Sequence, residues 1–163
     1  MKKILLLLFL IPNLVMGADC SIPDYSSDYT ISSACDQLDF TADYTNSLTV
    51  DANISSSHVG EGAINTSLYD ISRITINTGR TVHSSTGASG IQLNSYDHGT
   101  IENKGTVSSA GFGIHIAGLG SNAGTLANLI NSGTISAPVG SAAALMISTT
   151  KGLTTFTNTG TMT

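Results

Sequence analysis

A short motif recurs along the chain at a nearly constant interval, and it constrains the fold more than any other feature. The motif is Asn-x-Gly followed by Thr and then Val, Ile or Met, and the first copy carries Arg80 as an extra residue before its Thr. A unit of about 27 residues cannot bury its own apolar face, whereas stacked units share a core, so the repeat predicts a solenoid. The four copies begin at Asn77, Asn103, Asn131 and Asn158.

Apolar residues keep the same place in each unit. One follows every Gly-Thr step, and a patch with apolar residues two positions apart lies near the middle of the unit. Apolar residues at this spacing indicate a strand with one buried face. With 17 glycines and only 10% charged residues, the composition excludes a helical bundle or coiled coil. We therefore expect an all-β fold, a parallel β-helix of about four to five coils over residues 46–163. The patches are Ile91/Leu93, Ile114/Ile116 and Leu145/Ile147.

Two positions of the motif have structural interpretations. Stacked copies would align the four asparagines in one ladder, in which each side-chain amide bonds the next. The alternative is a turn preference alone, because Asn tolerates left-handed backbone and bonds its own main chain. The glycine of each copy is expected at positive φ, which a residue with a Cβ adopts only at a cost. These glycines are Gly79, Gly105, Gly133 and Gly160.

The N-terminus has the pattern of a secretory signal peptide. Lys2 and Lys3 precede an apolar run over residues 4–11, and the small residues Gly17 and Ala18 supply a cleavage site. The run is shorter than the roughly 20 residues that cross a bilayer, so a membrane anchor is the weaker alternative. We expect residues 1–18 to be removed and the chain to be exported.

The segment after the signal is acidic and contains both cysteines. Seven Asp and no Lys or Arg lie between residues 19 and 51. In an exported chain, the pair Cys20 and Cys35 predicts one disulfide, in preference to a reactive or metal-binding pair. The acidic residues lack the spacing of a Ca²⁺ loop. We expect residues 19–45 to form a disulfide-containing cap without a metal.

Few motifs carry chemistry. The sequence has no phosphate-binding loop and no nucleophile elbow, and its four histidines stand singly, so we expect no enzyme, metal or cofactor. A net charge of −5 without a basic patch argues against nucleic acid. The alternative is a carbohydrate-active β-helix enzyme built on Asp97 and Glu102, because such reactions use paired carboxylates. Asn53 lies in an Asn-x-Ser sequon with Asp51 two positions before it, and is a candidate glycosylation acceptor.

The Asn-x-Gly-Thr motif with its Gly-rich stretch and alternating apolar patch resembles the passenger region of Gram-negative autotransporters. The resemblance covers residues 46–163 and the export signal. It implies a right-handed β-helix that is secreted or held at the cell surface or outer membrane, where it serves adhesion to a host-cell protein or glycan.

Autotransporters also carry a C-terminal translocator barrel, and no such strands precede Thr163. We therefore expect the N-terminal part of a passenger, which touches a membrane only through export or through a missing translocator. An open strand edge would favour self-association. A truly truncated chain is expected in the periplasm, and a remnant without selected function is the further alternative.

Overall fold

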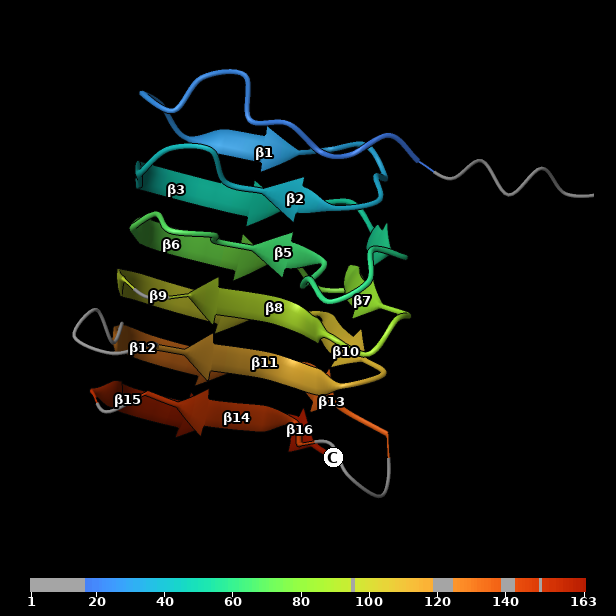
Figure 1. Ribbon diagram of the computed structural model, residues 1–163, viewed down its shortest axis with the longest axis vertical. Helices are drawn as coiled ribbons and strands as arrows, with labels where there is room; N and C mark the ends of the chain where they lie inside the picture. The colour runs from blue at the N-terminus through green and yellow to red at the C-terminus, as the bar shows by residue number, and fades with distance from the viewer. Residues whose placement is uncertain (1–16, 95, 119–124, 139–142, 150) are drawn as a thin grey trace, which may run out of the picture.

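The computed structural model describes residues 17–94, 96–118, 125–138, 143–149 and 151–163. These residues form an all-β parallel solenoid of about four turns, consistent with the right-handed β-helix that was expected (Figure 1). No described segment forms a helix long and apolar enough to cross a membrane. Residues 1–16 of the expected signal peptide lie outside the described residues.

Successive coils add strands in turn to three parallel sheets that run along the solenoid. The first sheet contains β1 (Tyr29–Ile31), β3 (Tyr44–Val50), β6 (Ile71–Ile76), β9 (Asp97–Asn103), β12 (Thr125–Asn131) and β15 (Gly152–Asn158). The second contains β4 (Ile54–Ser56), β7 (Thr81–Ser84), β10 (Thr106–Ser109), β13 (Thr134–Ser136) and β16 (Thr161–Met162). The third contains β2 (Leu38–Asp39), β5 (Ile64–Asn65), β8 (Ser89–Asn94), β11 (Phe112–Ala117) and β14 (Leu145–Ser148).

Equivalent residues of successive coils stack in register, and this stacking builds the core. The apolar patches predicted as strands lie in β8, β11 and β14, where Ile91 pairs with Ile114 and Ile114 with Leu145. Burying one aliphatic side chain stabilises a fold by roughly 1.5–3 kcal/mol, so the columns hold the coils together. In the second sheet the fully buried column is Ile54, Val82, Val107 and Ile135.

The segment expected as a separate cap is continuous with the solenoid. Strand β1 pairs with β3, β2 pairs with β5, and Cys35 forms a bridge with Ile54 of the second sheet. Residues 29–39 therefore contribute to all three faces, and the boundary expected at residue 46 falls inside β3. The expected disulfide joins Cys20 to Cys35, whose Cα atoms are 5.3 Å apart.

Candidate functional site

A row of asparagine side chains lies where the first sheet turns into the second. Asn103 Nδ2 donates to Asn131 Oδ1 at 2.8 Å, and Asn131 Nδ2 donates to Asn158 Oδ1 at 2.7 Å. The same nitrogens donate to the carbonyl oxygens of Thr134 and Thr161 in the next coil, at 3.0 and 3.3 Å. Asn103 and Asn131 are fully buried, and buried amides need such partners. The three asparagines hold one coil to the next.

Asn77 lies outside this row, contrary to the expected ladder. The strand register pairs Ile76, not Asn77, with Asn103, because the turn after Ile76 is longer than the turns of the later coils. Asn77 Nδ2 instead donates to Asp51 Oδ1 at 3.3 Å, and Arg80 Nε donates to the same oxygen at 3.0 Å. The hydrogen bonds from Arg80 and Asn77 lower the pKa of Asp51.

Only one of the four motif glycines has the expected positive φ. Gly79 has a φ of 76°, whereas Gly105, Gly133 and Gly160 do not adopt left-handed backbone. Glycine is required at Gly133 and Gly160 because the backbone of the preceding coil lies too close for a Cβ. A Cβ on Gly133 would lie 2.0 Å from the carbonyl oxygen of Gly105, and a Cβ on Gly160 would lie 2.1 Å from that of Gly133. The expectation of positive φ was therefore wrong for Gly105, Gly133 and Gly160, and Gly133 and Gly160 instead make room for the preceding coil.

A second polar row, which we did not predict from the sequence, lies where the chain enters the first sheet. The backbone N–H of Asp70 donates to Asp43 Oδ1 at 3.0 Å, and that of Asp97 donates to Asp70 Oδ1 at 2.9 Å. The hydroxyl of Thr125 continues the row by donating to Asp97 Oδ1 at 2.8 Å. The sequence separation is 27 in both aspartate steps, and this repeated interval is the signal that would have revealed the row.

Asp97 and Glu102, the carboxylates of the alternative enzymatic hypothesis, are not brought together. Both belong to β9, and five steps along an extended strand separate two Cα atoms by roughly 16 Å. Paired carboxylates of glycosidases are about 5–10 Å apart. Glu102 pairs with Arg73 at 3.3 Å and Lys104 at 3.0 Å, while Asp97 lies 3.8 Å from Lys151 Nζ. The carboxylate pair expected for that chemistry is therefore absent at this position.

Of the four histidines, His98 is buried in the core. It is 4% exposed, and neither ring nitrogen has a hydrogen-bond partner among the described residues. Burial lowers the pKa of His98. His115 points outward as expected and bonds Ser148 Oγ at 2.7 Å. His98 therefore acts as a neutral core side chain.

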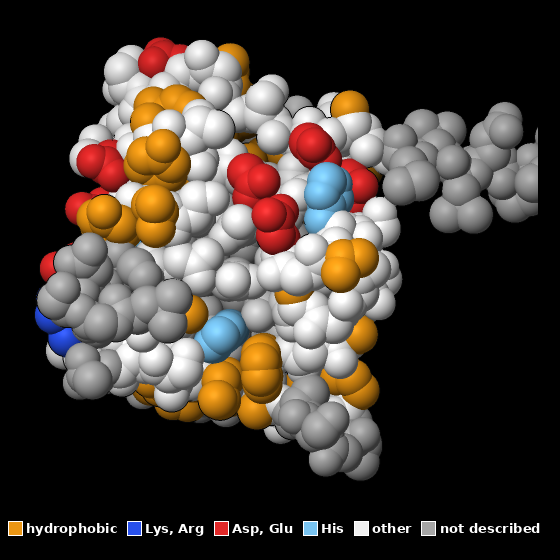
Figure 2. Space-filling model, in the orientation of Figure 1, with side chains coloured by type: hydrophobic (Ala, Val, Ile, Leu, Met, Phe, Trp, Pro, Cys, Tyr) orange, Lys and Arg blue, Asp and Glu red, His pale blue; other side chains and the backbone are white. Residues whose placement is uncertain are grey.

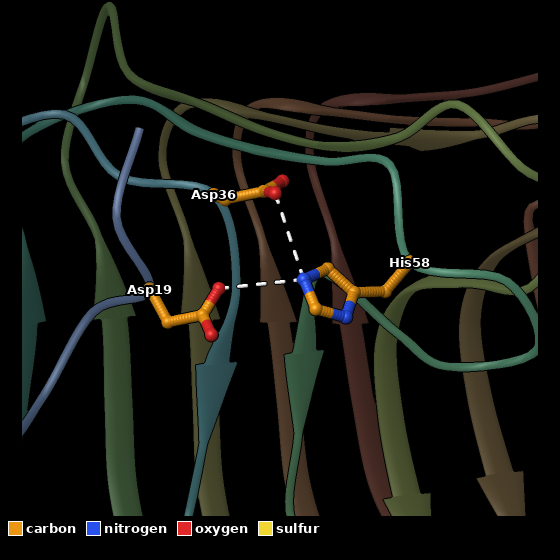
Figure 3. A group of neighbouring side chains, drawn as sticks. All are labelled: Asp19, Asp36 and His58. Carbon is orange, nitrogen blue, oxygen red and sulfur yellow. Dashed lines mark ion pairs between the residues drawn. The ribbon is translucent and has the colours of Figure 1, made fainter. Parts of the chain in front are cut away.

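Three side chains of the types that bind metal ions, Asp19, Asp36 and His58, converge near the start of the described chain (Figure 3). His58 Nε2 lies 3.4 Å from Asp19 Oδ1 and 3.5 Å from Asp36 Oδ2, and the ligand atoms of all three lie within 4.8 Å of one another. The side chain of Asp36 is only 8% exposed, compared with 40% for His58 and 62% for Asp19. One imidazole and two carboxylates are ligands that Zn²⁺ and similar ions accept. From the sequence we expected no metal here.

The surroundings of this cluster are acidic. Figure 2 shows Asp and Glu side chains gathered around a histidine beside the grey N-terminal segment. Glu61 accepts a hydrogen bond from Gln37 Nε2 at 3.0 Å. Burial, with the negative charge of Glu61 second, raises the pKa of Asp39. The cluster therefore lies in a negative field.

A groove of about 520 Å³ adjoins the cluster, and Asp36, Asn53 and His83 are among the residues that line it. The candidate glycosylation residue Asn53 is exposed, and its Oδ1 accepts a hydrogen bond from the backbone N–H of Thr81 at 3.0 Å. Its Nδ2, the atom that a glycan modifies, is not used in that bond, so the side chain stays a candidate acceptor.

No protein-family model, curated protein or solved structure matches this chain. The solenoid fold therefore rests on the structure, and the likeness to autotransporter passengers supports a proposal only.

Proposed function

We propose that the chain is a secreted, non-enzymatic surface protein, the N-terminal part of an autotransporter-like passenger that binds a protein or glycan of a host cell. The observation that carries this proposal is the unbroken stack of parallel coils. Its polar rows, from Asn103 to Asn158 and from Asp43 to Asp97, are used in holding coils together. A scaffold of this kind offers an extended surface for contact.

Export is supported by the disulfide, because such bonds are typical of exported proteins. We expect a C-terminally tagged chain to leave the cytoplasm and to begin at Ala18 or Asp19, as measured by fractionation and N-terminal sequencing. A chain that keeps its N-terminus and stays in the cytoplasm would contradict this part of the proposal.

One corner of the solenoid is suited to contact with a partner. The loops between the third and first sheets stack there, since the backbone N–H of Asn94 donates to Thr66 Oγ1 at 3.0 Å. These loops expose two large side chains, Leu68 at 62% and Tyr96 at 39%. We call Leu68 and Tyr96 the apolar corner. Aromatic side chains such as that of Tyr96 are enriched in the centres of binding interfaces, and Leu68 adds apolar area beside it.

Binding is tested with the purified chain on host cells and on glycan arrays. We expect Leu68→Asn and Tyr96→Asn to weaken cell binding, because they remove apolar area that a partner would cover. Val59→Asn is the matched control, since Val59 is 84% exposed but lies on the turn between the second and third sheets. Wild-type chain that binds no cell or glycan would overturn the adhesion proposal. Equal loss in all three variants would overturn the choice of corner.

Self-association through the last turn is part of the same proposal. Ile147 and Phe156, which continue the inner columns of β14 and β15, are 42% and 43% exposed. We expect the molar mass in light scattering to rise with concentration, and Ile147→Lys with Phe156→Lys to prevent this. A constant monomer mass in the wild-type chain would overturn it.

A further inference from the structure

We propose that Asp19, Asp36 and His58 bind one divalent transition-metal ion, with Zn²⁺ the best match, and that the Cys20–Cys35 disulfide organises this site. The proposal is independent of the adhesion function above, because it concerns the first coils and not the apolar corner.

The disulfide places the two carboxylates side by side. Asp19 directly precedes Cys20, and Asp36 directly follows Cys35. A backbone hydrogen bond fixes the same two segments, since the N–H of Cys20 donates to the carbonyl of Gln37 at 2.6 Å. The disulfide between the cysteines therefore also brings the two carboxylates close together. Ligands that are held in place before the ion arrives bind it more tightly.

The third ligand, His58, comes from the next coil, and the chain beside it is hydrogen-bonded to Asp36. The backbone N–H of Ser57 donates to Asp36 Oδ1 at 3.0 Å, which leaves Asp36 Oδ2 directed at His58 (Figure 3). The backbone N–H of His58 itself donates to Ser56 Oγ at 3.1 Å. Hydrogen bonds of this kind, behind the ligands, are what orient side chains in metal sites.

Two of the three separations between the ligand atoms match a tetrahedral ion. Two ligands that are each about 2.0–2.1 Å from Zn²⁺ lie about 3.3–3.4 Å apart. His58 Nε2 lies 3.4 Å from the oxygen of Asp19 and 3.5 Å from that of Asp36. These separations exceed the roughly 2.7–2.9 Å of a charge-assisted hydrogen bond. These two pairs are thus spaced as ligands of a common ion, and the two carboxylate oxygens lie within 4.8 Å of each other.

Charge also favours a divalent ion. Asp36 is only 6% exposed, and a buried carboxylate needs a compensating cation. A single positive charge on the imidazole would leave two carboxylates with a net negative charge, with Asp39 and Glu61 nearby. A divalent ion with a neutral imidazole balances the two carboxylates. Ca²⁺ is disfavoured because it takes six to eight oxygen ligands.

The test is a Zn²⁺ titration of the purified, disulfide-bonded chain, in competition with a chromophoric zinc indicator. We expect one equivalent to bind. Losing an orienting residue behind the ligands already costs about 10–100-fold in affinity, so Asp36→Asn and His58→Gln should each cost about 100-fold or more. His115→Gln is the matched control, because His115 is bonded to Ser148 in a later coil. No bound Zn²⁺, or equal affinity in Asp36→Asn, His58→Gln and wild type, would overturn the site.

Two further measurements keep the proposal testable if Asp36→Asn does not fold. Zn²⁺ should raise the melting temperature of the wild-type chain but not that of Asp19→Asn or His58→Gln, because only a folded site gains binding free energy. The double variant Cys20→Ser with Cys35→Ser should bind Zn²⁺ about 10–100-fold more weakly, as its carboxylates lose their anchor. Unchanged affinity in the double variant would overturn the role of the disulfide, and Ca²⁺ binding as tight as Zn²⁺ binding would overturn the choice of ion.

Discussion

His98 occupies a position that aliphatic side chains fill in the neighbouring coil. It pairs with Leu126 of the next coil, and it lines the same small interior cavity as Ile71 and Leu93. A buried imidazole without hydrogen-bond partners is less stable there than an aliphatic side chain of similar size. We expect His98→Leu to raise the free energy of unfolding by about 1–3 kcal/mol near neutral pH, as measured by urea denaturation.

The same residue predicts a pH dependence. Burial lowers the pKa of His98 in the folded chain, so the unfolded chain binds a proton that the folded chain excludes. Stability therefore falls as the pH drops below about 6.5, the pKa of an unfolded histidine, and the loss continues down to the lowered pKa of the folded state. We expect a shallower loss between pH 7.5 and pH 5 in His98→Leu. Parallel curves for variant and wild type would contradict this assignment.

Replacing two glycines of the motif by alanine should destabilise the fold to different extents. Nothing lies within 4 Å of a Cβ on Gly79, so Gly79→Ala bears only the cost of left-handed backbone, about 1–2 kcal/mol. At Gly133 the Cβ meets a carbonyl oxygen of the previous coil at 2.0 Å. We expect Gly133→Ala to lose about 3 kcal/mol or more, because the backbones must move apart. Thermal melts of both variants check the order, and a milder effect at Gly133 would contradict it.

At the scale of the strands and turns, side-chain rows supplement the backbone hydrogen bonds of the sheets. The asparagine row begins only in the coil of β9, and earlier coils fill the same column with Val50 and Ile76. An amide in this column needs amide neighbours, whereas an aliphatic residue needs only apolar contact. The column is thus divided into an apolar part and a hydrogen-bonded part.

Asn131 is the central member of its row, so its loss should be expensive. Asn131→Ala removes its bonds to Asn103 and Asn158 and leaves buried polar atoms unpaired, which costs about 2–4 kcal/mol. Asn77→Ala, outside the row, should cost less than about 1 kcal/mol. Chemical denaturation compares the two. Simultaneous replacement of Asn103, Asn131 and Asn158 by Val should cost less than the three single changes together.

Most of the fold could be predicted from the period of the repeat, because equivalent residues of stacked coils must share a register. It located β8, β11 and β14 from their apolar spacing. It failed at Asn77 because the first copy, with its extra Arg80, forms a longer turn, and Asn77 belongs to that turn instead of the strand column. The group of candidate metal ligands could not be predicted, because Asp19, Asp36 and His58 follow one another at unequal intervals that are unrelated to the repeat. The expected disulfide could have revealed half of it, since pairing Cys20 with Cys35 also places Asp19 near Asp36.

At the scale of the whole molecule, each coil contacts mainly its two neighbours, so stability is a sum of local terms. The Cys20–Cys35 disulfide stabilises the first coil of the solenoid. On the chain-entropy account, a bridge across a sequence separation of 15 contributes roughly 3 kcal/mol.

We expect the double variant Cys20→Ser with Cys35→Ser to lose about this amount, with the damage concentrated in the first coils. Hydrogen exchange should speed up in β1 and β2 and stay unchanged in β10 and β13, which lie several coils away. Uniform acceleration through all the sheets would show instead that the solenoid unfolds as one cooperative unit.

The coil-by-coil register described above also bears on the order in which the chain can fold. A stack whose layers rest only on adjacent layers can grow from one end while the remainder is still extended. Each coil that docks supplies the sheet edges on which the next coil forms. Folding can therefore proceed in single-coil steps from whichever coil forms first.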